Sequence, residues 1–142
     1  MSSVNPPQPH VLVLLDHAFR GARKVLEAAN PPAPGLRPSH YRLLDHTPSG
    51  GIRLTELANR ANMTKQALGE MVVTLQAAGL MEVSPDPTDG RARLVNLTPE
   101  GSRMRDRIQR TIGAIERDLR RRVGAEKWAV FREVLDEMAH PS

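Results

Sequence analysis

The stretch LTELANRANMTKQALGEMVVTLQAAGL, residues 54–80, constrains the fold of this chain more than any other segment. Apolar residues recur at helical spacing in two short runs, which predicts one helix over residues 55–62 and a second over residues 65–78. Asn62 lies between them and tolerates the left-handed backbone conformation that a tight turn requires. The segment therefore predicts two short helices that cross closely.

Capping residues and small apolar side chains fit this arrangement. Thr55 and Thr64 are expected to be N-caps, because a threonine hydroxyl accepts a hydrogen bond from a free backbone N–H group at a helix start. Gly79 is expected just beyond the second helix, where many helices end in a left-handed residue. Ala58 is small at the point where the helices would cross. The predicted core between them contains Leu57, Met63, Leu68 and Val72.

A β-hairpin is predicted to follow the second helix. The segments LMEV, residues 80–83, and RLVNL, residues 93–97, alternate in polarity, and SPDPTDGRA joins them as a long tip. Arg91 and Arg93 alternate on one face of the incoming strand, and Asp89 is expected to pair with one of them across the turn. The paired arginine would be held in place while the other projects, and we expect Arg91 to project at the tip.

The sequence before this unit predicts helices separated by a stiff connection. Residues 11–29 show apolar residues at helical spacing with a broad apolar face. The proline-rich segment NPPAPGLRP, residues 30–38, cannot continue that helix, because proline lacks the backbone donor. A short helix is expected after Pro38, ending at PSGG, and residues 52–54 are expected to form a short strand.

Two further helices are predicted after the hairpin. In LTPEG, Thr98 is an expected N-cap and Pro99 takes the first helical position, where its missing N–H group is not needed. A long helix should run from there to Gly124, which breaks it. The last helix is expected over residues 126–139.

These elements predict a mainly α (α+β) protein with a winged helix-turn-helix domain over residues 36–101. The segments 10–35 and 102–142 are expected to form a helical dimerisation region, because their apolar stripes exceed what the small central domain could cover. The alternative is that the stripes form the core of a single protomer. Residues 1–9 are polar and proline-rich and are expected to be a disordered tail.

Charge is distributed unevenly along the chain. The whole chain carries a formal net charge of +4, yet residues 36–100 hold seven basic and seven acidic side chains. A DNA-binding function for this segment therefore has to rely on a few placed cations. Residues 101–122 hold eight arginines against three acids. We interpret that run as a solvated helix face supported by pairs such as Asp106 with Arg110, with contact to DNA or to a ligand as the alternative.

Several function classes are disfavoured by the composition. There are no cysteines, which removes disulfides, thiolate metal sites and thiol-based redox sensing. No glycine-rich phosphate loop, nucleophile motif or metal-ligand spacing is present, so we expect neither an enzyme nor a metal or other cofactor. The longest apolar run, VLVLL at residues 11–15, is too short to cross a bilayer, and the N-terminus lacks signal-peptide features. We expect a cytoplasmic protein without a membrane partner.

The second helix of a helix-turn-helix reads the major groove of double-stranded DNA. Its free face would begin with Thr64, Lys65 and Gln66 and continue through Gly69 and Glu70. Lysine can donate to guanine or to a phosphate, glutamine can pair with adenine, and glutamate can accept from cytosine or balance the lysine. Glycine costs about 1 kcal/mol against alanine inside a helix, and close approach to the DNA backbone would explain its presence. A wing arginine would enter a narrow minor groove.

On these residues the chain resembles the MarR family of bacterial transcriptional regulators. The resemblance rests on LTELANRANMTKQALGEMVVTLQAAGLMEV, on DGRAR, which fits the family's Asp-x-Arg-x-Arg wing pattern, and on LVNLTPEG directly after it. It covers residues 36–101 at the level of motifs, and the flanking helices match in placement only. By position, the resemblance implies that Thr64, Lys65, Gln66 and Gly69 lie in the recognition helix and that Arg91 and Arg93 lie in the wing. Many family members have arginine or lysine where Glu70 stands, so the half-site of this chain is expected to be unusual.

The resemblance implies a homodimer that binds a roughly palindromic operator, usually as a repressor. It also implies a small, often aromatic, effector held between the dimer region and the DNA-binding lobe. His17, Phe19, His40 and Tyr41 could line that cavity, since the first two helices flank it in the family; plain packing is the alternative. A second class of function is a winged-helix protein that acts through protein–protein contacts only.

Overall fold

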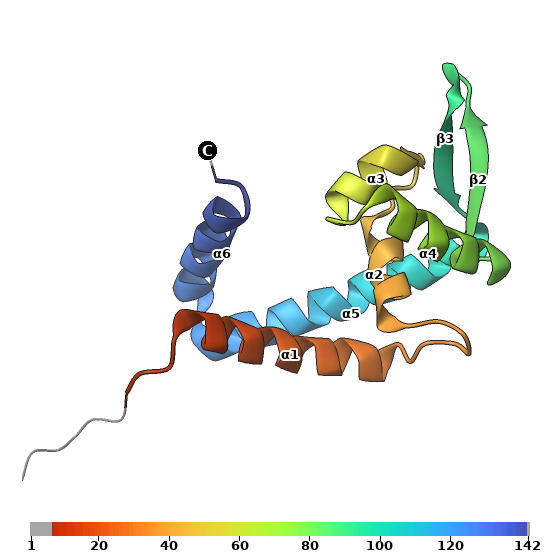
Figure 1. The fold of residues 1–142 in the computed structure, drawn as a ribbon. Coiled ribbons are helices and arrows are strands. Elements are labelled where there is room, and N and C mark those ends of the chain that lie inside the picture. Colours follow the sequence, from red (N-terminus) through yellow and green to blue (C-terminus); the bar gives the residue numbers. More distant parts are fainter. Residues whose placement is uncertain (1–6, 142) are drawn as a thin grey trace, which may run out of the picture.

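The structure is a computed structural model and describes residues 7–141. Its elements follow the order α1 (Val11–Ala29), α2 (Pro38–His46), β1 (Ile52–Arg53), α3 (Leu54–Arg60), α4 (Lys65–Ala77), β2 (Met81–Asp86), β3 (Asp89–Leu97), α5 (Pro99–Val123) and α6 (Ala125–Ala139). Figure 1 shows α2, α3, α4 and the β2–β3 hairpin gathered at one end of the long helix α5, with α6 at its other end. The predicted mainly α fold with a winged helix-turn-helix is confirmed.

Local sequence signals determine most of the helix boundaries. The Thr64 hydroxyl accepts a hydrogen bond from the Ala67 N–H group at 3.1 Å, at the start of α4. The Thr98 hydroxyl accepts one from the Gly101 N–H group at 3.0 Å, at the start of α5. Asn62 has a φ of 51°, in the left-handed region. The two caps and the tight turn are therefore as predicted from the sequence.

The predicted cap of the first helix of the motif is wrong. Helix α3 begins at Leu54, so Thr55 lies in its first turn and Arg53 takes the cap position without a side-chain hydrogen bond. The cause is strand β1, whose Ile52 pairs with Val95 in an antiparallel register. This pairing fixes the extended backbone immediately before the helix, and the helix starts without a capping side chain.

The predicted long tip of the hairpin is also wrong. Strands β2 and β3 continue to Asp86 and Asp89, so only two residues, 87 and 88, connect them. The sheet order is β1-β3-β2, which makes β2 an edge strand. A proline is tolerated on an edge strand, because the N–H group that it lacks would otherwise face solvent. Pro85 therefore lies within β2 instead of ending it.

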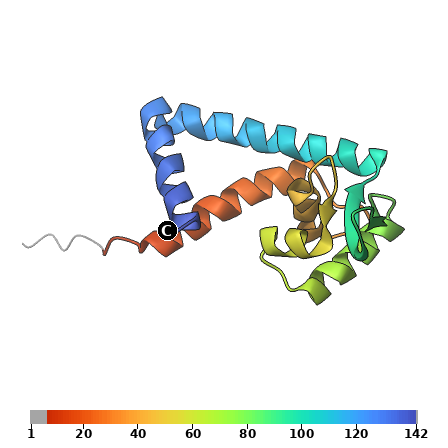
Figure 2. The ribbon, with the colours of Figure 1, turned by 90° about the horizontal axis from the view of Figure 1, so that it is seen from above.

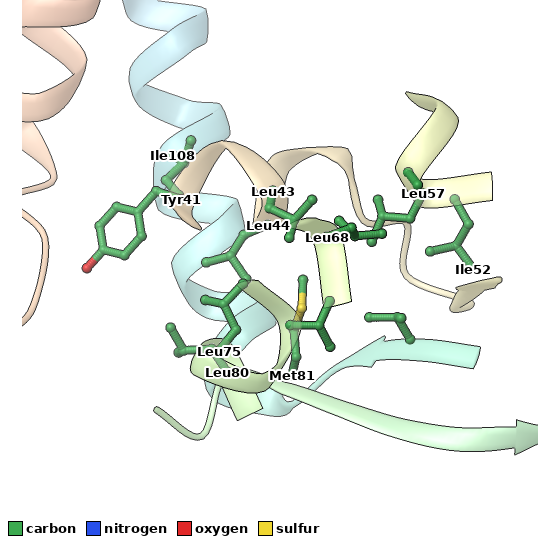
Figure 3. Packing of buried hydrophobic residues seen from close by; sticks show 13 residues of the cluster. Tyr41, Leu43, Leu44, Ile52, Leu57, Leu68, Leu75, Leu80, Met81 and Ile108 are labelled. Carbon is green, nitrogen blue, oxygen red and sulfur yellow. The ribbon is translucent and has the colours of Figure 1, made fainter. Parts of the chain in front are cut away.

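The hydrophobic core lies in the winged helix-turn-helix, as Figure 3 shows. Leu57, Leu68 and Val72 are buried there, as predicted, whereas Met63 is half-buried at the margin of the cluster. Ile108 of α5 enters the same cluster and joins the long helix to α2. The largest fully buried apolar side chains are Leu43, Leu44, Leu57, Leu68, Leu75, Val95 and Ile108.

Helices α1 and α6 contain no fully buried residue, although the half-buried Leu26 of α1 packs against this core. Helix α1 is tied to α5 near its C-terminal end, where the Asn30 side-chain amide donates to the Thr111 hydroxyl at 3.1 Å. Figure 2 shows that α1 and α5 extend beyond the winged domain and that α6 lies at the far end of α5. Within residues 7–141, none of the helices is both long enough and apolar enough to cross a membrane. The first six residues of the predicted tail, 1–9, lie outside the described part of the chain.

Candidate nucleic-acid interface

Helix α4 presents a polar face opposite its buried one. Leu68, Val72 and Leu75 point into the core and anchor the helix. The predicted recognition residues at its N-terminal end lie on the other side, where Thr64, Lys65, Gln66 and Glu70 are exposed and Gly69 is half-buried. The structure therefore brings the five predicted residues onto one accessible surface.

Nothing inside the protein requires a glycine at position 69. A Cβ atom built there would meet no other atom within 4 Å, and the residue does not have a positive φ. Because glycine in a helix interior is less favourable than alanine by about 1 kcal/mol, its presence is not explained by packing. Open space next to this backbone is what a close approach by another molecule requires.

The wing is attached to the rest of the domain by Asp86, a residue that the sequence analysis passed over. Asp86 is only 7% exposed, and its carboxylate accepts from the Arg53 Nε atom at 2.8 Å. The same carboxylate accepts from both the backbone N–H and the hydroxyl group of Thr88, each at 2.8 Å. Because Arg53 belongs to β1, this cluster joins the two-residue turn of the hairpin to the start of the helix-turn-helix.

These hydrogen bonds lower the pKa of Asp86 below its usual value. The Thr88 backbone and hydroxyl donors are the main cause, and Arg53 adds to the shift. A carboxyl group whose pKa is lowered by folding stabilises the folded state above its unfolded pKa, and that stabilisation disappears as the pH falls through the folded pKa. The contribution of Asp86 should thus be complete at neutral pH and lost only in strong acid.

We expect Asp86→Asn to lower the melting temperature at pH 7 and to loosen the hairpin. The difference between the variant and the wild type should shrink as the pH is lowered below about 4, because Asp86 begins to take up a proton there in the unfolded chain and does so in the folded protein only at lower pH. Melting curves over a series of pH values would measure this. Asp89→Asn is the matched control on the opposite strand, and an equally large loss in that variant would contradict the role of Asp86.

The wing arginines are exposed and free of carboxylate partners. Within residues 7–141, no ion pair joins Arg91 or Arg93 to an acidic group, so the expected pairing with Asp89 is wrong. Asp89 instead accepts from the backbone N–H group of Arg91 at 3.1 Å. It shapes the backbone that carries Arg91 and leaves the guanidinium group free.

A break in the strand register separates the two arginines. Pro85 is paired with Arg93, but the next pair is Asp86 with Asp89, so the residues in between have no partner on β2. Arg91 lies in this bulged segment, near the end of the hairpin, and Arg93 lies on the regular ladder. Bulges bend a strand and redirect side chains. The irregular register therefore places Arg91 off the ladder and Arg93 on it, a difference that simple alternation did not predict.

Arg105 differs from the other arginines of α5 because it contacts the segment after α2. Its side chain is 12% exposed, and its guanidinium group donates to the Thr47 carbonyl at 3.0 Å and to the Ser49 hydroxyl at 3.1 Å. Gln109 makes a parallel contact, donating to the Asp45 carboxylate at 3.2 Å. Together they fasten α5 to the C-terminal end of α2.

The other arginines of residues 101–122 remain on the surface, in accordance with a solvated helix face. The expected pair of Asp106 with Arg110 is wrong, because Asp106 accepts from the adjacent Arg105 at 3.4 Å and no ion pair with Arg110 occurs in the described part of the chain. The sequence does not distinguish Arg105 from the other arginines, because all eight lie on the same helix in similar arginine-rich surroundings.

The residues predicted to line an effector cavity do not come together. A cavity of about 50 Å³ does lie between α1, α2 and α5, and Tyr41 lines it along with Arg23, Leu26, Glu27, Asn30, Pro38, Arg42, Asp45, Ile108 and Ile112. His17 and Phe19 are exposed on α1, outside the lining. His40 is buried and its Nδ1 atom accepts from the Arg37 N–H group at 2.9 Å, with a pKa lowered mainly by burial. Of the four, Tyr41 alone reaches this cavity.

Arg23 is the polar group of this cavity that stands out. Its Nε atom is buried and has no hydrogen-bond partner among the described residues. Its terminal nitrogen pairs with Glu27 at 3.1 Å, and its guanidinium carbon lies 5.5 Å from the centre of the Phe19 ring. An unsatisfied buried donor is costly, and the lining of this cavity contains an arginine whose hydrogen-bonding capacity is not fully used by the described residues.

Comparison with known proteins identifies the architecture. The sequence profile of the MarR family matches residues 35–92. The HTH-type transcriptional regulator PetP of Rhodobacter capsulatus is 30% identical over 92 residues, which are 65% of this chain and 55% of that protein, so the chain matches about half the length of this relative.

Two solved structures have the same fold over nearly the whole chain. CouR from Rhodococcus jostii RHA1 has a TM-score of 0.78 with 23% identity and 93% of both chains covered. BpsR of Bordetella bronchiseptica has a TM-score of 0.77 with 20% identity, covering 97% of this chain and 100% of its own. The profile match over the helix-turn-helix, the relative's sequence and these architectures agree with one another. The chain thus resembles the MarR family over its winged helix-turn-helix, and it shares the fold of these solved structures over nearly its whole length.

Proposed function

We propose that the protein is a transcriptional repressor that binds a palindromic DNA operator as a homodimer. The observation that carries the proposal is the pairing of two free surfaces: the polar face of α4 and the hairpin with two exposed arginines that have no acidic partner among the described residues. A helix for the major groove and a cationic wing for the adjacent minor groove are the two parts of such a reader.

Selection of DNA from a random pool by the purified protein tests this function. The expected product is one sequence with inverted half-sites whose centres lie about 34 Å apart, one turn of the duplex. A gel shift with the DNA that flanks the protein's own gene would then locate an operator. Recovery of unselected DNA with no common sequence would favour the alternative of a winged-helix protein that acts through protein contacts.

The dimer is supported by apolar side chains that the described chain leaves uncovered. Phe131, Val134 and Met138 of α6 share one helix face and are 42%, 46% and 58% exposed. Helix α1 also has exposed apolar residues: Val11, Leu12, Leu14, Phe19 and Val25 are all more than half exposed. A monomeric protein rarely leaves so many large apolar side chains exposed on two helices. We infer that residues 10–35 and 102–142 form the contact between two copies.

Sedimentation equilibrium would test the dimer. The double variant Phe131→Glu/Val134→Glu should be monomeric and should lose most of its affinity for a two-half-site operator. Glu133→Gln, on another face of the same helix, should remain dimeric. A wild-type protein that sediments as a monomer at micromolar concentration would refute the homodimer.

Gly69 provides a sharper test of the DNA-facing surface. We expect Gly69→Ala to stabilise the free protein by up to about 1 kcal/mol, because the site has room and alanine favours a helix. The same variant should bind its operator more weakly if the DNA backbone approaches this glycine. Denaturation curves and a binding titration on one preparation would show both effects. Stabilisation with unchanged operator affinity would show that DNA does not approach residue 69.

We further propose that a small aromatic acid acts as the effector that releases the operator. The cavity beside Tyr41 and Arg23 supports this, and DNA binding by BpsR is described as regulated by 6-hydroxynicotinic acid. At about 50 Å³ the cavity is far smaller than the roughly 300 Å³ at the lower end of ligand sites, so a ligand has to separate α2 from α5. Aromatic carboxylates should lower operator affinity in the wild type and have no effect on Arg23→Met.

A further inference from the structure

A second cleft lies at the junction of α5 and α6, within the segment 102–142 that is proposed for the contact between two copies. Its volume is about 550 Å³, within the range of about 300–1,000 Å³ that is typical of small-molecule sites. Three of its lining residues are arginines, and the other three are alanine or glycine. The lining residues are Ala114, Arg117, Arg120, Arg121, Gly124 and Ala125.

The positive charge of this cleft is not balanced by the protein. Within residues 7–141, Arg117 and Arg120 form no ion pair with an acidic group. Arg121 contacts Asp118 at 3.2 Å, but that carboxylate is shared with Arg122, which lies closer at 2.8 Å. The one carboxylate paired with an arginine of the cleft is therefore shared with Arg122, and the guanidinium groups of Arg117 and Arg120 have no acidic partner among the described residues.

DNA bound to the winged domain cannot be that anion. Helix α5 rises about 1.5 Å per residue, so Arg117 lies about 27 Å along the helix from Pro99, beside the wing. Electrostatic interactions between exposed charges are screened over about 8 Å at physiological ionic strength. Figure 1 shows the α5–α6 junction at the opposite end of the molecule from the hairpin. The arginines of the cleft therefore need a different explanation from Arg91 and Arg93.

The backbone at the cleft adds to its preference for anions. Gly124 has a φ of 92° and caps α6 without a side-chain hydrogen bond, so the first N–H groups of α6 are not capped by a side chain. Such groups carry partial positive charge. Glu126 is the acidic residue of this first turn, and in the described chain it forms no ion pair with the arginines.

We propose that this cleft binds a small organic diphosphate. Guanidinium groups bind phosphate oxygens in a bidentate manner, and several arginines together favour a ligand with two or more negative charges over a monocarboxylate. The cleft is too large for a phosphate ion alone, and its alanine and glycine wall leaves room for the organic part. The site is separate from the cavity beside Tyr41, so the protein has places for two chemically different ligands.

Titration calorimetry on the intact protein without DNA tests the site, with ADP and pyrophosphate as probes at constant ionic strength. We expect saturable binding of ADP in the wild type. The double variant Arg117→Ala/Arg120→Ala should bind it at least tenfold more weakly. Arg110→Ala removes an exposed arginine from the same helix outside the cleft and should bind like the wild type.

Three results would overturn the proposal. They are no saturable binding of either probe, an equal loss in the Arg110→Ala control, and dissociation of a dimer by the double variant with ADP binding retained. The last result would assign these arginines to the contact between two copies. Binding of pyrophosphate as tightly as ADP would support the site and place recognition on the diphosphate. Because DNA is absent from the assay, a negative result leaves the proposed operator binding untouched.

Discussion

Replacing Gly101 with alanine should destabilise the protein by several kcal/mol, more than any surface change. Gly101 is buried at the start of α5, and a Cβ atom there would overlap the backbone carbonyl oxygen of Leu80. That carbonyl cannot move away easily, because it accepts from the Thr98 N–H group at 3.2 Å while the Thr98 hydroxyl donates to the Gly79 carbonyl at 2.6 Å. Overpacking against fixed atoms costs about 1–3 kcal/mol or more, a large share of a typical stability of about 5–15 kcal/mol.

Urea denaturation would measure the effect, with Gly113→Ala as the matched control on the same helix. The nearest atom to a Cβ at residue 113 is the end of the flexible Arg117 side chain, at 3.3 Å. This control should therefore be neutral or slightly more stable than the wild type, because alanine favours the helix by up to about 1 kcal/mol. Equal stability of the two variants would show that the junction of β2 and α5 adjusts to a side chain.

The double variant Arg91→Ala/Arg93→Ala should bind the operator on the order of 10–100-fold more weakly than the wild type. Both side chains are exposed and have no acidic partner in the described chain, so their loss should leave folding intact while removing two cations from the wing. The slope of log affinity against log salt should also fall by about 2, one for each lost contact. Fluorescence anisotropy with the selected operator at several salt concentrations would measure both quantities.

Arg110→Ala serves as the control for charge alone, because it removes an exposed arginine that lies on α5 outside the wing. Single variants would show which of the two wing arginines enters the minor groove. The bulge favours Arg91, since it places that residue near the end of the hairpin. A folded double variant with unchanged affinity and salt dependence would remove the wing from the proposed interface.

Short-range signals predicted much of this fold from the sequence. Thr64, Asn62 and Thr98 each act on backbone within a few residues, so their roles do not depend on the rest of the molecule. The prediction of Thr55 as an N-cap was wrong because the start of α3 is set by the pairing of β1 with β3, which lies more than forty residues further along the chain. Pro85 was misread as a turn residue because its place on an edge strand depends on the strand order.

The candidate site shows the same division. The polar face of α4 follows from helical spacing, and the exposure of Lys65 and Gln66 was predictable. The support of the wing was assigned to Asp89 because it is close in sequence, whereas Asp86 has that role through Arg53 on another strand. Likewise, the burial of Arg105 among eight similar arginines depends on where α2 ends in space. Long-range contacts of this kind leave no mark on local sequence patterns.

The continuity of α5 has a mechanical consequence for the proposed regulator. Its 25 residues form one helix about 37 Å long, with the winged domain at one end and α6 at the other. A tilt of about 5° pivoting at the far end would displace the wing by roughly 3 Å, close to the rise of about 3.4 Å between successive base pairs. In the proposed regulator, a change at the α6 end would therefore be enough to move the recognition helices out of register with the operator without any ligand reaching the DNA-binding surface.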